Sequence, residues 1–256
     1  MSDRNPNMPN NDREKFVISK FVPASIYARE DDVIHTRLCV YNYYSELFPE
    51  KKSGADVHIW FFDQEGEQVG KREFKIGYQG QLQYDLSELG TQFEGIACLS
   101  IVPEDPPRFR HSGVSSGFYS FYSDDHGHSD FSHEWETLRF SAKETSPWIC
   151  VVRPFQFPET DIIVMNSCFA NNENESYAPW AIKIRNSQGE NISEKEMPAL
   201  KPRGSARINV LEVFPEIDTG KFKSETLSVE VTGINIQGPF TYVKAPNGDF
   251  NLHHFC

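Results

Sequence analysis

Histidine is the residue type whose spacing in this sequence first suggests chemistry. Six of the eight histidines gather in or beside two short segments: His111, His126, His128 and His133 in one, His253 and His254 in the other. Residues two apart in an extended strand point to the same face, so His126 and His128 could share one metal ion. Adding His133, Glu134 or His253 would supply the nitrogen and carboxylate ligands that Zn or Fe(II) accepts.

The same segment also fits an exposed hairpin turn. Residues 124–130 read Asp-Asp-His-Gly-His-Ser-Asp, which are residue types typical of turns. The matching stretch of the second half, residues 245–248, reads Ala-Pro-Asn-Gly and contains no metal ligand. A polar turn is therefore the favoured interpretation, and no cofactor is expected.

A second group of candidates recurs in both halves of the chain. His133 and His254 occupy matching places, near Tyr119 and Tyr122 in the first half and Tyr242 in the second. Aromatic side chains on a sheet surface can stack on sugars or contact a protein partner. Packing explains the same pattern, since alternate residues of a strand also fill a core. These five residues are the candidate ligand-binding positions.

An internal duplication connects these observations. Four segments match in order at nearly constant separation: residues 37–42 with 161–166, 57–66 with 180–189, 82–89 with 206–213, and 117–127 with 238–248. Repeated spacing of this kind is the signature of a duplicated unit. The last match places Gly127 on Gly248.

Each half contains short runs rich in Val, Ile, Phe, Tyr and Thr that are separated by Gly, Pro, Asn and Asp. In the first half they centre near residues 16–21, 33–43, 57–62, 71–76, 80–85, 96–102, 117–122 and 135–141. Such runs predict an all-β chain, a tandem pair of antiparallel β-sandwiches that resemble immunoglobulin-like domains. Residues 85–89 and 209–213 are expected to form single helical turns. The predicted domains are residues 16–144 and 148–256, after a disordered tail at residues 1–15.

Composition limits the classes of partner. The formal net charge is −12 and the basic residues form no long run, which disfavours binding to nucleic acid. No stretch approaches the roughly 20 apolar residues of a membrane helix, and the polar N-terminus lacks the apolar core of a secretory signal. A cytoplasmic location without membrane insertion is expected.

No coherent catalytic set emerges, so the sequence favours a non-catalytic binding or scaffolding protein. Its tandem sandwiches and the cleft between them would hold a protein, a glycan or a small ligand. One alternative is a metal-dependent enzyme that uses the histidine-rich segment. Another is a structural assembly subunit, because sandwiches expose edge strands that can pair in a homo-oligomer.

Overall fold

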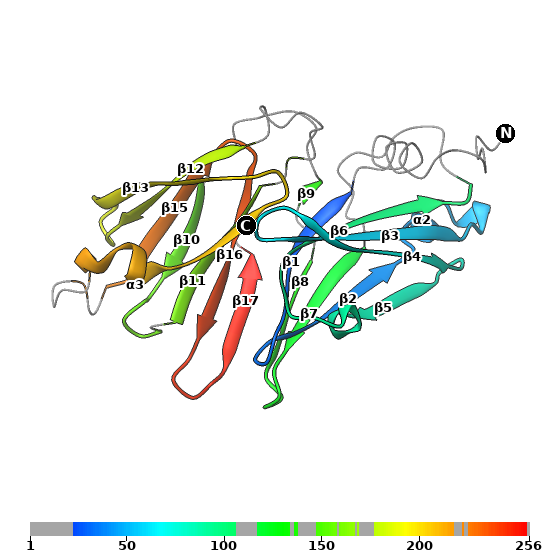
Figure 1. Ribbon diagram of the computed structural model, residues 1–256, viewed down its shortest axis with the longest axis horizontal. Coiled ribbons are helices and arrows are strands. Elements are labelled where there is room, and N and C mark those ends of the chain that lie inside the picture. The colour runs from blue at the N-terminus through cyan, green and yellow to red at the C-terminus, as the bar shows by residue number, and fades with distance from the viewer. Residues whose placement is uncertain are drawn as a thin grey trace.

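The computed structural model describes residues 23–105, 117–133, 136–137, 147–157, 159–166, 168, 177–217, 222 and 225–254. The predicted tail at residues 1–15 and the predicted strand at residues 16–21 lie outside these ranges. Within them most residues lie in strands, which form four antiparallel sheets (Figure 1). The prediction of an all-β chain with tandem sandwiches is confirmed. No helix in the described part is long and apolar enough to cross a membrane.

The first unit is a sandwich of two sheets. Sheet A has the order β4-β3-β6-β1-β9, and its strands are β1 (Ala24–Glu30), β3 (Ala55–Asp63), β4 (Gln68–Ile76), β6 (Phe93–Pro103) and β9 (Glu136–Thr137). Sheet B has the order β5-β2-β7-β8, with β2 (His35–Tyr41), β5 (Gln81–Asp85), β7 (Phe118–Ser123) and β8 (Ser129–His133). Alternation along β2 buries Leu38 and Val40 between the sheets. Short helical turns α2 (Tyr44–Leu47), η1 (Pro49–Lys51) and η2 (Leu86–Leu89) link the strands.

The second unit repeats this plan. Sheet C has the order β10-β15-β12-β13, with β10 (Trp148–Val152), β12 (Ala178–Arg185), β13 (Asn191–Leu200) and β15 (Leu227–Gly233). Sheet D has the order β14-β11-β16-β17, with β11 (Glu159–Asn166), β14 (Ser205–Asn209), β16 (Ile236–Lys244) and β17 (Phe250–His254). The turns α3 (Val210–Val213) and η4 (Pro215–Ile217) follow β14. Taking the strands in chain order, β10 to β17 occupy the same places as β1 to β8.

The matched turns confirm the register of the duplication. Gly66 and Gly189 both have positive φ, and each donates its N–H to the carbonyl three residues earlier, that of Asp63 or Asn186. Gly127 and Gly248 repeat this geometry in the β7–β8 and β16–β17 turns. The expected helical turns are present as η2 and α3, and Asn209 caps α3 through its side-chain oxygen. The sequence prediction omitted β1 and β8 from its runs.

An apolar junction joins the two units. The outer face of sheet D carries Ile163, Met165, Phe240, Tyr242 and Leu252, and all five are buried. They belong to the same hydrophobic cluster as the core of the first unit. Tyr27 of β1 meets Phe240 with ring centroids 6.2 Å apart. Along these residues the two units are packed together.

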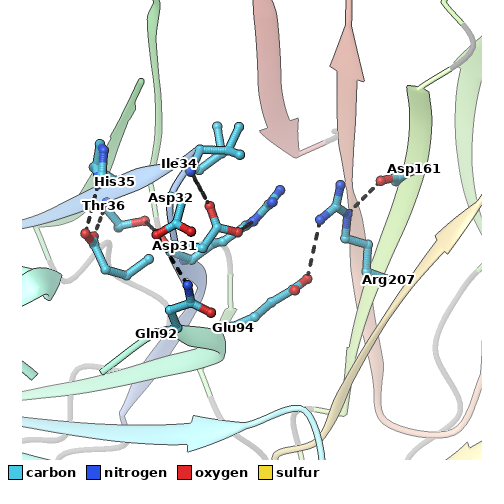
Figure 2. Close-up of polar contacts among 12 residues, drawn as sticks. Asp31, Asp32, Ile34, His35, Thr36, Gln92, Glu94, Asp161 and Arg207 are labelled. Atoms are coloured by element: carbon cyan, nitrogen blue, oxygen red, sulfur yellow. Dashed lines mark hydrogen bonds and ion pairs between the residues drawn. The ribbon is translucent and has the colours of Figure 1, made fainter. Parts of the chain in front are cut away.

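Polar contacts frame this junction. Arg207 of β14 lies 2.6 Å from Asp161 and 4.0 Å from Glu94 of β6, as Figure 2 shows. Glu94 also accepts a hydrogen bond of 2.7 Å from the hydroxyl of Tyr27. Beside them, β8 and β17 run next to each other in Figure 1, and Asp130 accepts hydrogen bonds from the Asn251 side chain and the Leu252 N–H.

At Gly66 the backbone of the first unit closely approaches that of the second. A Cβ atom added there would lie 2.2 Å from the carbonyl oxygen of Pro202, in the turn between β13 and β14. The φ angle of +77° independently favours glycine. The turn between β3 and β4 therefore abuts the second unit without a side chain in between.

Gly66→Ala should destabilise the protein more than the matched Gly189→Ala. Both variants lose about 1 kcal/mol or more to a left-handed backbone, but Gly189 has no atom within 4 Å of its virtual Cβ. Only Gly66→Ala must also displace the turn at Pro202. Urea unfolding of both variants measures the difference, and equal losses would mean that this contact is not tight.

Candidate functional site

Two of the predicted ligand-binding tyrosines are buried. Tyr122 is fully buried in the first unit and its hydroxyl donates a 2.6 Å hydrogen bond to the carbonyl of Tyr27. Tyr242 is buried in the junction, with the guanidinium groups of Arg207 and Arg29 at 4.9 Å and 5.8 Å from its ring centre. Both rings are buried in this structure, and a ligand-binding role for these two residues stays a prediction. Alternation along β7 and β16 turned both side chains toward packed layers.

The histidines of the β7–β8 turn are held by carboxylates. His128 Nδ1 lies 2.7 Å from Asp124, and its Nε2 lies 2.7 Å from Asp249 of the second unit. The hydrogen bond with Asp124, followed by the attraction of both carboxylates, raises the pKa of His128. Desolvation by itself would raise the pKa of the Asp124 carboxyl. Hydrogen bonds from the side chain and backbone of His128 outweigh this effect, so the pKa is lowered. The turn thus fastens the first unit to the second.

The described residues do not supply a set of ligands for the predicted metal ion. His126 and His128 have ring centroids 6.2 Å apart, and no group of three His, Cys, Asp or Glu side chains in the described residues could hold an ion. Glu134 lies outside the described residues. His253 pairs through its backbone with Thr241, and its side chain is not described. A Zn or Fe(II) site at these residues remains a prediction.

His133 and His254 occupy matched places on β8 and β17. His133 pairs with Tyr119 in the ladder of β7 and β8, as His254 pairs with Phe240 in that of β16 and β17. The side chain of His254 is not described. Their recurrence matches the backbone register of the duplication, and a ligand-binding role for both stays a prediction.

Exposed aromatic side chains instead gather on the outer face of sheet B. Tyr119 and Phe121 alternate along β7 with buried Phe118, Ser120 and Tyr122, and are 38% and 46% exposed. Phe131 of β8 pairs with Phe121, and their rings are stacked with centroids 5.9 Å apart. Phe131 is 58% exposed. We call Tyr119, Phe121 and Phe131 the aromatic face.

An open hollow of about 700 Å³ adjoins the aromatic face at Phe121. Its lining includes Glu30, His35, Arg37, Asp85, Asp124 and Asp125. Arg37 and Asp85 form an ion pair at 2.6 Å. His35 bonds Glu30 at 2.9 Å and lies 3.3 Å from Asp125, and the hydrogen bond with Glu30 is the main cause of its raised pKa. Carboxylates outnumber cations in this lining, so the hollow favours a basic group.

Among the residues predicted from sequence, Tyr119 lies on the aromatic face, whereas Phe121, Phe131, Arg37 and Asp85 were missed. The period of two along residues 118–123 was visible in the sequence. It did not show which alternate set faces water. The partner of Phe121 on β8 could not be identified, because the predicted runs do not include that strand.

Known proteins similar to this chain are found among solved structures. No family model and no curated protein matches this chain. Among solved structures, a β-glucuronidase of glycoside hydrolase family 2 is similar over 90% of this chain and 24% of its own, at 12% identity and a TM-score of 0.19. The exo-β-D-glucosaminidase CsxA is similar over 79% of this chain and 24% of its own, at 9% identity and a TM-score of 0.17. The chain spans about a quarter of each enzyme.

Asp249→Asn should lower the pKa of His128. A histidine with a raised folded pKa adds stability below the ordinary value near 6.5 and loses that contribution as pH rises through the folded value. Nuclear magnetic resonance titration of the His128 ring in both proteins measures this shift. His35 should not respond to the substitution and serves as the internal control. An unchanged His128 titration would mean that Asp249 does not reach the ring in solution.

Proposed function

We propose that this chain is a non-catalytic binding or scaffolding protein that holds a protein partner on the aromatic face of its first unit. The observation that carries the proposal is the internal repeat of that face. In the ladders with β2 and β11, Tyr119 and Phe121 stand opposite Cys39 and Arg37, as Phe240 and Tyr242 stand opposite Ile163 and Asp161.

The equivalent surface of sheet D is already a protein contact. The equivalent residue pairs are Tyr119 with Phe240, Phe121 with Tyr242, and Phe131 with Leu252. The second member of each pair is buried against the first unit, whereas the first member is exposed. Solvent-exposed aromatic clusters are typical of recognition surfaces. Because the equivalent positions of sheet D already contact protein, a protein partner is favoured over a glycan or a small ligand.

The hollow adds a preference for charge to the aromatic face. Apolar contact on the aromatic face would supply affinity, whereas the acidic lining near Phe121 would select a basic side chain of the partner. The junction and the contacts between β8 and β17 hold the second unit beside this surface in a fixed orientation. A fixed orientation suits scaffolding, because the partner is then placed relative to both units.

Site-specific photo-crosslinking in the cells that make the protein tests this proposal. A photoreactive phenylalanine analogue at Phe121 should give a discrete covalent protein adduct, identified by mass spectrometry. The same analogue at Val69, an exposed residue of β4 outside the aromatic face, is the matched control. Equal or absent labelling at Phe121 and Val69 would refute a binding role for the aromatic face.

Elemental analysis separates the proposal from the metal-dependent alternative. Purified protein should contain no stoichiometric transition metal, since both ring nitrogens of His128 already face carboxylates. A stoichiometric metal that His126→Ala or His128→Ala removes would favour the enzyme instead.

A further inference from the structure

We propose that copies of this chain associate head to tail, with the β10 edge of one copy lying on the aromatic face of the next. The inference rests on the proposed function and names its protein partner as a second copy of the chain. It starts from where exposed apolar side chains are found. Besides the aromatic face, β10 displays Ile149 and Val151, which are 53% and 56% exposed.

The position of Val151 in the second unit is that of Tyr27 in the first. Tyr27 pairs with Ile96 of β6, which in turn pairs with Phe62 of β3. Val151 pairs with Ser228 of β15, which pairs with Arg185 of β12 in the same order. By the same ladders Ile149 corresponds to Ser25.

The two positions of the Tyr27–Phe240 contact in the junction therefore each have an exposed equivalent. Within the chain, Tyr27 of β1 receives Phe240 of sheet D. In a neighbouring copy, Val151 would receive Tyr119, the equivalent of Phe240. The Val151–Tyr119 pair would take the place of the Tyr27–Phe240 pair. Both Val151 and Tyr119 are exposed in the single chain. Burial of these side chains supplies the driving force for association.

A charged residue of the junction also has an equivalent in the proposed contact. In the junction, the guanidinium of Arg29 lies 5.8 Å from the ring centre of Tyr242. Arg153, directly after β10, is the sequence equivalent of Arg29 and is exposed. The equivalent of Tyr242 is Phe121, which adjoins the acidic hollow. Arg153 of one copy would thus lie over Phe121 of the next, a cation–π contact beside Asp85 and Asp125.

The polar pair that frames the junction also has compatible equivalents. Arg207 and Glu94 lie 4.0 Å apart within the chain. Their equivalents are Gln83 in sheet B and Thr226 next to β15, both uncharged. A copy placed in this way would bring no like charges together at that point.

The two surfaces lie on different units, so the contact is heterologous. A heterologous contact leaves one aromatic face and one β10 edge free after each addition, and it builds an open chain of copies unless the rotation closes a ring. The mass in solution should then rise with concentration beyond two copies of the 29.4 kDa chain.

Two complementary variants test this arrangement. Phe121→Asp removes the aromatic face, and Val151→Asp removes the β10 edge, because it places a carboxylate against the ring of Tyr119. Each variant keeps the other surface. Sedimentation and light scattering should show that each is monomeric alone, and that an equimolar mixture forms a dimer and stops there. Val69→Asp should associate as wild type does, and circular dichroism checks that each variant is folded.

Several results would overturn the proposal. These are a wild-type protein that stays monomeric at high concentration, a wild-type dimer that Val151→Asp leaves intact, and an equal loss of association in Val69→Asp. The photo-crosslinking experiment separates this failure from that of the proposed function. A Phe121 adduct with a different protein would retain the binding role and reject self-association.

Discussion

Burial of the outer face of sheet D against the first unit is the contact on which the arrangement of this molecule depends. Ile163, Met165 and Phe240 belong to one hydrophobic cluster with the core of the first unit. The two sandwiches are therefore packed against each other and are not joined by the linker alone. Because the cluster continues across the junction, separating the units would expose apolar surface, and the cost scales with the area that water would regain.

This contact explains why two copies of one unit have diverged. Trp60 and Phe62 on the outer face of sheet A are buried, whereas their equivalents in sheet C are Lys183 and Arg185, partly exposed. Sheet C instead carries ion pairs, with Arg185 and Lys183 both near Glu230. The outer face of sheet C is therefore polar except along β10, which exposes Ile149 and Val151.

The amino-acid sequence predicts the strands, the duplication and the turns because each depends on local spacing. The sequence alone matches Asp63 and Gly66 with Asn186 and Gly189. Tyr122 and Tyr242 could not be told from Tyr119, since the period of two says only that alternate residues share a face. Which face is covered depends on the other unit. The histidine turn was identified as polar, but its contact with Asp249 joins residues far apart in the chain.

Asp130 has a consequence for the unpaired edges of the sheets. Its carboxylate accepts the backbone N–H of Leu252 on the outermost strand of sheet D, and that donor would otherwise face outward. A free edge of this kind is a template for cross-strand pairing between molecules, the first step toward amyloid-like aggregates. The Asp130 carboxylate thus removes one hydrogen-bond donor from that edge as long as the two units stay in contact.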